Sequence, residues 1–171
     1  MAKRAILIIA LLLILGRPVL ADVTYLPLIA APMFDAPVTW ATVSHIVDGD
    51  TFDVDLDGDG LTDERVRPIG IDTPERGECY YAEAKARAVE LLLGRRVALQ
   101  RDVSERDRYD RLLRYVYLGD GTFWNGRMVR EGFARAGCWK PDCRYLAHLQ
   151  ALQALAQGEA LGGWGACGWG P

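Results

Sequence analysis

Residue types that bind transition metals are scarce in this 171-residue chain. It has two histidines, His45 and His148, and four cysteines. Because the cysteines are expected to form disulfides, zinc is the less favoured metal for any site in this chain. Basic residues are missing from one stretch: eight acidic side chains stand between Asp48 and Glu64, with no Lys or Arg among them. Like charges held close together repel, so this stretch is expected to bind something positive.

Long hydrophobic runs are also lacking, apart from the apolar segment Ala5–Leu15. A transmembrane helix needs about 20 apolar residues, so an uncleaved membrane anchor is the less favoured alternative. The run follows Lys3 and Arg4 and precedes the small-residue site Val19–Ala21, a pattern typical of a signal peptide. We therefore predict three segments in the chain: a signal peptide (1–21), an N-terminal extension (22–39) and one globular domain (40–171).

Export places the four cysteines in an oxidising compartment, where disulfides form. We expect a secreted or periplasmic product that has no stable membrane association after cleavage. The spacing favours two bridges, because Cys138 and Cys143 can close a small loop and leave Cys79 to pair with Cys167. Sequence alone allows three pairings.

The two signs of charge are segregated along the chain. Removal of residues 1–21 would leave 17 basic and 23 acidic residues, a net charge of −6. Residues 85–144, in contrast, contain 14 basic and 8 acidic residues. A cation bound by the acidic stretch would leave the basic half free to meet an anion such as nucleic acid.

Hydrophobic periodicity predicts an α+β fold in which helices pack on a small barrel. Two strands of a hairpin are predicted. The first is a half-buried strand in which Phe52, Val54 and Leu56 alternate with aspartates, and the second contains Val66, Ile69 and Ile71. Residues 57–60 form the turn between them. Pro68 indicates a bulge or a sheet edge in the second strand. Further strands are predicted at 97–99 and 113–118.

Three helices are predicted from apolar spacing and end signals. The first covers Tyr80–Leu93, stops at Gly94 and would bury Ala82, Ala86, Val89 and Leu93. The second would be capped by Asn125 and carry Met128, Val129, Phe133 and Ala136. The third would be capped by Asp142 and carry Leu146, Leu149, Leu152 and Leu155.

Acidic residues at the strand ends form a candidate metal site. Asp50 precedes the first hairpin strand and Asp72 follows the second, so a hairpin can bring the two carboxylates together, with Glu75 close behind. Carboxylates, a backbone carbonyl and waters suit Ca²⁺. Arg67 and Arg111 supply guanidinium groups that match phosphate oxygens in pairs. This combination favours phosphoryl chemistry at a metal.

Four segments carry a family resemblance. They are VDGDTF (47–52), RPIGIDTPE (67–75), DRYDRLLRYVYL (107–118) and NGRMVREGFARAG (125–137). In this order they resemble the signature blocks of the staphylococcal nuclease, or thermonuclease, family, and the resemblance covers about residues 40–166.

The resemblance implies a five-stranded OB-type β-barrel with three packed helices, and a monomeric enzyme that hydrolyses DNA and RNA with Ca²⁺ and leaves 3′-phosphate ends. The calcium ligands that it implies are the carboxylates of Asp50 and Asp72 and the backbone carbonyl of Thr73. Glu75 would orient or deprotonate the attacking water, and Arg67 and Arg111 would hold the phosphate.

Three residues are expected to contact the substrate: Arg108, Tyr109 and Trp139. Trp139 and Gly137 stand near the place where the family has a pair of nucleotide-stacking tyrosines, so Trp139 is expected either to stack on a base or simply to pack. Asp110 stands where the family has a glycine. Its carboxylate is expected to compete with phosphate for Arg111 and to lower activity.

The turn of the hairpin resembles the opening of a calcium loop. Its carboxylates are those of Asp55, Asp57, Asp59 and Asp63. The loop lacks the glutamate at position twelve, where Val66 stands. We predict a second, structural calcium site here, with a solvated turn as the alternative.

Other functions remain open. One is a catalytically weak OB-fold module that binds nucleic acid or oligosaccharide, and another is a metal-dependent phosphodiesterase for small nucleotides. An enzyme is favoured because the chain has all five candidate residues of the metal–phosphate site: Asp50, Arg67, Asp72, Glu75 and Arg111. Singly, each has a structural alternative, such as a surface ion pair between Arg67 and Glu75 or a pair between Arg111 and Asp110.

Overall fold

The computed structural model describes residues 36–170. The elements follow one another as β1 (Val38–Asp48), β2 (Thr51–Asp55), β3 (Glu64–Pro68), β4 (Ile71–Asp72), α2 (Tyr81–Leu92), β5 (Arg96–Gln100), β6 (Leu112–Tyr117), α3 (Trp124–Arg130), β7 (Arg135–Ala136), α4 (Leu146–Gly158) and α5 (Gly163–Ala166). The predicted signal peptide lies outside the described residues. Within them, no helix has the length and apolar character needed to cross a membrane.

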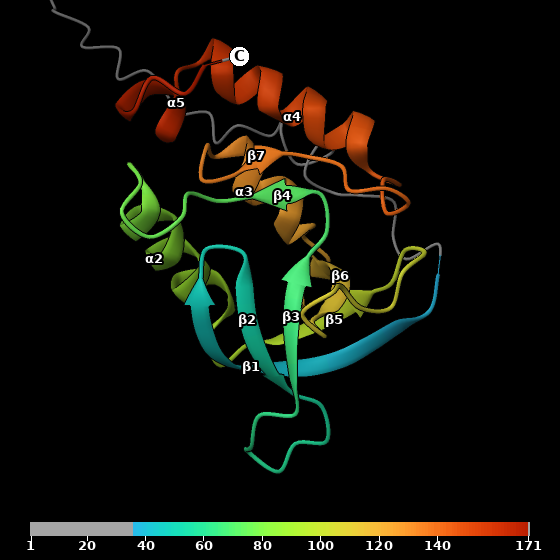
Figure 1. The fold of residues 1–171 in the computed structure, drawn as a ribbon. Helices are drawn as coiled ribbons and strands as arrows, with labels where there is room; N and C mark the ends of the chain where they lie inside the picture. Colours follow the sequence, from blue (N-terminus) through green and yellow to red (C-terminus); the bar gives the residue numbers. More distant parts are fainter. Residues whose placement is uncertain (1–35, 171) are drawn as a thin grey trace, which may run out of the picture.

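Five strands close into a barrel in the order β1-β2-β3-β6-β5, and β5 pairs back with β1 (Figure 1). β3 and β6 run parallel, and the other barrel pairs run antiparallel. The predicted α+β fold with a five-stranded barrel is confirmed. Because β1 begins at Val38, the barrel takes in the last residues of the predicted N-terminal extension.

Helices cover the barrel as expected. Three of the described helices, α2, α3 and α4, have seven or more residues, and α5 adds a short fourth. α2 lies along the side of the barrel, while α3, the small β4–β7 sheet and α4 lie over one end (Figure 1). The apolar side chains of the strands and the inner faces of the helices form one core, which includes Phe52, Leu92, Tyr115, Trp124 and Leu149.

The prediction of a half-buried first hairpin strand was wrong. All residues of β2 are buried, including Asp53 and Asp55, and Leu56 lies beyond the strand and is exposed. The acidic residues are tolerated because they have partners. Asp53 accepts two hydrogen bonds from Arg65, at 2.7 and 3.2 Å, and backbone amides of the following loop donate to Asp55.

The second hairpin strand is divided at Pro68. This residue ends β3, opposite Arg114 of β6, rather than marking a bulge or an edge within one strand. The chain then turns and forms β4, which leaves the barrel to pair with β7. The division matters for function, because it places Asp72 above the end of the barrel (Figure 1).

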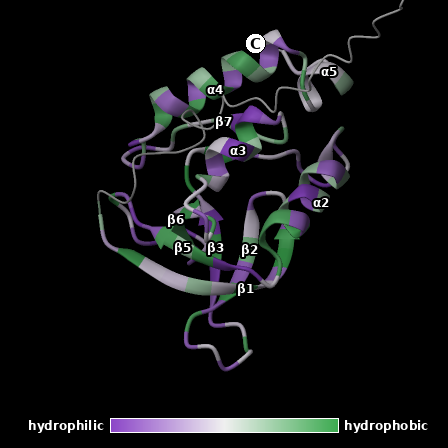
Figure 2. Cartoon of the chain, turned by 180° about the vertical axis from the view of Figure 1, so that it is seen from behind, coloured by the Kyte–Doolittle hydropathy of each residue, from purple (hydrophilic) through white to green (hydrophobic). Residues whose placement is uncertain are grey.

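The helix α2 is present, but its predicted buried face was wrong. Its buried residues are Ala84, Ala88 and Leu92, whereas Val89 and Leu93 are exposed. Both sets have near-helical spacing and both include alanines, and hydrophobic and hydrophilic residues alternate along α2 (Figure 2). The prediction favoured the face with Val89 and Leu93 because their aliphatic side chains are longer than alanine, but that face is exposed.

Asn125 does not cap a helix. It lies buried within α3, where its Oδ1 accepts the N–H of Val116 at 2.9 Å and its Nδ2 donates to the carbonyl of Ile69 at 2.8 Å. α3 also ends at Arg130, so the predicted helix residues Phe133 and Ala136 lie beyond it. Asn125 thus fastens α3 to the turn after β3.

Asp142 does not cap α4, whose N-cap residue is Tyr145. Asp142 is buried, and its Oδ1 accepts the backbone N–H groups of Val103 at 3.0 Å and Ser104 at 2.8 Å. It therefore joins the loop before α4 to the loop between β5 and β6. The buried face of α4 contains Leu149, Leu152 and Ala156.

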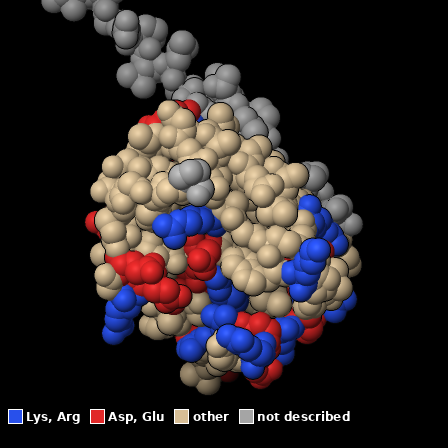
Figure 3. Space-filling view, turned by 45° about the horizontal axis from the view of Figure 1, so that its top comes forward, with Lys and Arg blue, Asp and Glu red and all other residues tan. Residues whose placement is uncertain are grey.

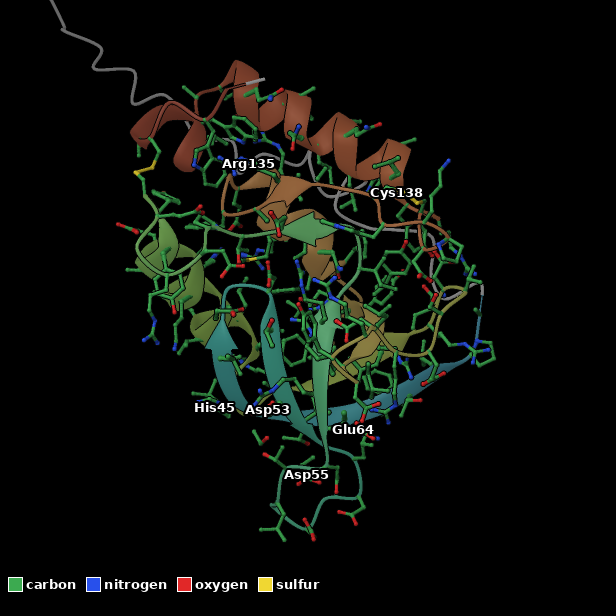
Figure 4. All side chains as sticks on the ribbon, in the orientation of Figure 1. His45, Asp53, Asp55, Glu64, Arg135 and Cys138 are labelled. Carbon is green, nitrogen blue, oxygen red and sulfur yellow. A yellow bond between two sulfur atoms is a disulfide. The ribbon has the colours of Figure 1, made fainter. Side chains whose placement is uncertain are left out.

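Both predicted disulfides are present. Cys79, before α2, is bonded to Cys167, after α5, and Cys138 is bonded to Cys143. The first bridge ties distant parts of the chain together, and the second closes a six-residue loop that precedes α4 (Figure 4). No free cysteine is found among the described residues.

Candidate active site

Asp50 is held in a buried position in the turn between β1 and β2. Its Oδ2 accepts two hydrogen bonds from Thr73, from the backbone N at 2.7 Å and from Oγ1 at 2.9 Å. The neighbouring Gly49 permits this contact, because a Cβ on Gly49 would lie 2.7 Å from Thr73 Oγ1. The absence of a side chain at Gly49 therefore allows the first turn and the segment after β4 to meet.

Arg67 joins the two candidate calcium carboxylates. Its guanidinium is largely buried, and Nη2 lies 3.1 Å from Asp72 Oδ1 and 3.4 Å from Asp50 Oδ2. These two carboxylate oxygens are thus no farther apart than the sum of those distances. Nη1 donates to the carbonyls of Ile71 at 2.9 Å and Pro68 at 3.2 Å, which fixes the side chain. Arg67 does not form the surface ion pair with Glu75 that was the alternative; its carboxylate partners are Asp50 and Asp72.

Asp48 belongs to the same group and was missed in the sequence. Its Oδ1 accepts the Asp50 N–H at 3.0 Å. Burial raises the pKa of Asp48, and the nearby carboxylate of Asp50 raises it further. The alternation of acid and glycine in Asp48-Gly49-Asp50 was the available signal, because it places two carboxylates on one tight turn.

Glu75 follows β4 on an exposed turn. Its backbone N–H donates to Glu78 Oε2 at 2.9 Å, and its carbonyl accepts the Glu78 N–H at 2.9 Å. Partial burial raises the pKa of Glu75, and the charges of Asp50, Asp48 and Asp72 raise it further. The carboxylate of Glu75 is therefore a stronger base than an isolated one.

Arg111 reaches this group from the loop before β6. Its Nη1 lies 3.4 Å from Thr51 Oγ1, and Thr51 Oγ1 lies 3.4 Å from Asp50 Oδ1. The prediction that Asp110 competes for the Arg111 guanidinium was wrong. Asp110 is exposed and lies 3.6 Å from Arg106, whereas Asp107 pairs with Arg111 at 2.7 Å.

A cavity of about 660 Å³ opens beside these residues. The predicted site residues that line it are Arg67, Asp72, Arg108, Tyr109, Arg111 and Trp139. Tyr109 and Trp139 are both more than half exposed, and the Arg111 guanidinium lies 5.4 Å from the Tyr109 ring. Figure 3 shows basic and acidic side chains next to one another on one face of the molecule. A phosphate and an attached base can be accommodated together in such a cavity.

The donor set fits a hard divalent cation. Asp50 and Asp72 offer carboxylate oxygens and Thr73 a backbone carbonyl, and Arg67 pairs directly with both carboxylates. Burial is the main cause of the raised pKa values of Asp48 and Glu75, and the nearby carboxylates add to it although Arg67 lowers both. Oxygen donors in a mainly carboxylate group suit Ca²⁺ rather than a softer metal.

The turn between β2 and β3 holds a separate acidic group. Carboxylate oxygens of Asp55, Asp57 and Asp63 all lie within 4.8 Å of one another. Asp59, expected in the same group, lies outside it, and its Oδ1 accepts the Leu61 N–H at 2.7 Å. Figure 4 shows Asp55 at the end of the barrel opposite to β4, so this group is remote from Asp72.

Comparison with known proteins relates the chain to one family. The family described as Staphylococcal nuclease homologue matches residues 65–166, a range that includes Arg67, Asp72, Glu75 and Arg111 but begins after Asp50. A thermonuclease of Staphylococcus intermedius is 38% identical over 128 residues, which are 71% of this chain and 74% of that protein. A thermonuclease of Staphylococcus hyicus is 37% identical over 121 residues, 67% of this chain and 69% of that protein. The SPbeta prophage-derived endonuclease YokF of Bacillus subtilis is 35% identical over 136 residues, 75% of this chain and 45% of its own length.

Proposed function

The chain belongs to the staphylococcal nuclease family, and we propose that it is a Ca²⁺-dependent nuclease that hydrolyses phosphodiester bonds of DNA and RNA to 3′-phosphate products. The observation that carries the proposal is the position of Arg67 between Asp50 and Asp72, at the edge of a cavity that Arg111 also lines. One site thus combines carboxylates for a metal with guanidinium groups for a phosphate.

The residues that would hold Ca²⁺ are Asp50, Asp72 and the backbone carbonyl of Thr73. When bound, the ion would supply Lewis-acid stabilisation of the negative charge that develops on the phosphate oxygens. Asp48 would support the site through its hydrogen bond to the Asp50 N–H. Its role is to fix the turn on which Asp50 is carried.

Glu75 would orient the attacking water and accept its proton. Partial burial, and after it the neighbouring carboxylates, raise the pKa of Glu75 and so increase its basicity. Water would attack phosphorus in line with the departing 5′ oxygen, and that P–O bond would break to leave the phosphate on the 3′ side. Glu75 follows Asp72 by three residues, and Asp72 lines the cavity, which supports this assignment.

Arg67 and Arg111 would hold the two non-bridging phosphate oxygens. Both guanidinium groups are already fixed by hydrogen bonds, Arg67 to backbone carbonyls and Arg111 to Asp107. Fixed donors stabilise developing charge without reorganisation during the reaction. Arg108, Tyr109 and Trp139 would contact the adjoining nucleotides, and single-stranded or denatured nucleic acid suits the exposed aromatic rings.

The setting proposed for this enzyme is outside the cytoplasm, as a monomer in the periplasm or the medium. Two disulfides support this location, since such bonds persist in oxidising compartments. The signal peptide (1–21), the extension (22–39) and the nuclease domain (40–171) remain part of the proposal. A second, structural Ca²⁺ is proposed for Asp55, Asp57 and Asp63, which form the close group; Asp59, predicted with them, lies outside it.

The test is hydrolysis of denatured DNA and of RNA by the purified mature chain, in Ca²⁺ and in an excess of chelator. We expect cleavage in Ca²⁺ only, with products that carry 3′-phosphate ends. Binding of the same substrates without cleavage would instead favour the catalytically weak binding module. Cleavage that persists in chelator would reject the assignment of the metal.

A further inference from the structure

We propose that the Cys138–Cys143 disulfide is a positioning element of the substrate site, which fixes Trp139 against Arg67 so that the ring forms one wall of the cavity before substrate binds. The inference rests on the proposed function, because it assigns this loop a contribution to substrate binding. Neither cysteine would touch the substrate, and both would act through Trp139.

The loop that carries Trp139 is tightly closed. The two cysteine Cα atoms lie 5.3 Å apart, and five residues separate them in sequence. Inside the ring, the Asp142 N–H donates to the Trp139 carbonyl at 3.1 Å. A ring this small has few backbone conformations, so the position of the Trp139 Cα is restricted.

The indole ring lies against Gly137 and beside Arg67, and more than half of it is exposed. A Cβ on Gly137 would lie 2.6 Å from Trp139 Cη2, so the ring rests where a side chain at Gly137 would otherwise stand. The Arg67 guanidinium lies 5.8 Å from the ring centroid. Trp139 nevertheless remains 54% exposed, which is unusual for a tryptophan with only a packing role. An exposed indole beside arginine is the surface on which a nucleobase stacks.

The same loop is anchored to a second segment that lines the cavity. Asp142 accepts the N–H groups of Val103 and Ser104, and this segment continues towards Tyr109 and Arg111. Opening the disulfide would leave these hydrogen bonds in place. The expected consequence is local: Trp139 gains freedom, whereas the fold and Arg111 stay as they are.

The second disulfide provides a matched control. Cys79 and Cys167 connect the start of α2 to the end of α5, and neither residue lines the cavity. Reduction breaks both bridges, so it cannot separate their effects. Substitution of one cysteine pair by serine removes one bridge and leaves the other.

The experiment compares four variants of the mature chain with wild type: Cys138→Ser/Cys143→Ser, Trp139→Ala, the combination of these three changes, and Cys79→Ser/Cys167→Ser. kcat and KM for denatured DNA are measured in Ca²⁺, at a temperature at which circular dichroism shows each variant folded. We expect the first two variants to raise KM about fivefold or more, with kcat within about twofold, because a stacking contact is lost. The combined variant should show no further increase, and the Cys79/Cys167 variant should lose thermal stability with KM unchanged.

Three results would overturn the inference. They are an unchanged KM in Cys138→Ser/Cys143→Ser, a combined variant whose KM increase is the product of the two separate increases, and a Cys79→Ser/Cys167→Ser variant whose KM rises as much as that of Cys138→Ser/Cys143→Ser. If wild type cleaves no nucleic acid, the proposed function fails while positioning is still measured. Affinity for a fluorescent pentathymidylate then replaces KM, and equal affinity of wild type and Cys138→Ser/Cys143→Ser would reject the role of the disulfide.

Discussion

Asp107 Oδ2 accepts a hydrogen bond from Arg111 Nε at 2.7 Å, which fixes the guanidinium that faces the cavity. The other oxygen of the same carboxylate accepts the Arg111 N–H at 3.0 Å. Burial alone would raise the pKa of Asp107, but hydrogen bonds from Arg111 outweigh it and lower the pKa. The contact orients Arg111. If Asp107 instead competed with the substrate phosphate for Arg111, removal of its charge would raise activity rather than lower it.

Asp107→Asn should lower kcat/KM for denatured DNA by about tenfold, because Arg111 loses its orienting partner and a positioned group is worth a large part of catalysis. The measurement is steady-state kinetics in Ca²⁺ beside wild type. An increase in activity would show that Asp107 instead competes with the substrate phosphate for Arg111.

Asp110→Gly should stabilise the protein by about 1 kcal/mol and leave kcat within about twofold of wild type. Asp110 has φ 65°, a left-handed conformation that costs little for glycine, and its carboxylate faces Arg106 rather than Arg111. Urea unfolding and kinetics on the same preparation test both parts. A large gain in activity would restore the idea that Asp110 competes for Arg111.

Gly49→Ala should impair activity more than about tenfold and destabilise the fold by about 1–3 kcal/mol. The new Cβ would meet Thr73 Oγ1 and separate Thr73 from Asp50. Gly119→Ala is the control, because its nearest contact would be an ordinary 3.8 Å to the Arg96 carbonyl. Normal activity of Gly49→Ala would mean that Asp50 does not need the contact with Thr73.

Calcium stoichiometry tests the turn between β2 and β3. Titration calorimetry of the mature chain should detect two ions, and Asp57→Asn/Asp63→Asn should bind one while cleavage continues. Asp59→Asn is the control and should keep both, because Asp59 lies outside the close group. A single ion bound by wild type would leave this turn as a solvated loop.

Patterns in the sequence predicted the barrel, the disulfides and the meeting of Asp50 with Asp72 because these depend on strand order and on motif spacing. Predictions of helix caps failed where side chains bond to distant residues. Asn125 binds the carbonyl of Ile69, and Asp142 binds the N–H of Val103. A capping rule considers only neighbours in sequence, so it cannot detect partners that folding brings together.

Arg111 shows the same limit within the site. Its neighbour Asp110 was an obvious rival for the guanidinium, yet the left-handed turn at Asp110 directs that carboxylate away. Asp107, four residues before Arg111, forms the ion pair with the guanidinium instead. The backbone conformation of a turn decides which carboxylate reaches the arginine, and the residue types alone do not specify it.

The central claim is that one metal–phosphate site unites Asp50, Asp72, Arg67, Glu75 and Arg111. The most direct test is the turnover of denatured DNA in saturating Ca²⁺ by Glu75→Gln and by Arg111→Ala, each shown to be folded. Each variant should lose at least about 10²-fold in kcat, because each removes a group used mainly in the transition state. Wild-type turnover by either variant would contradict the account.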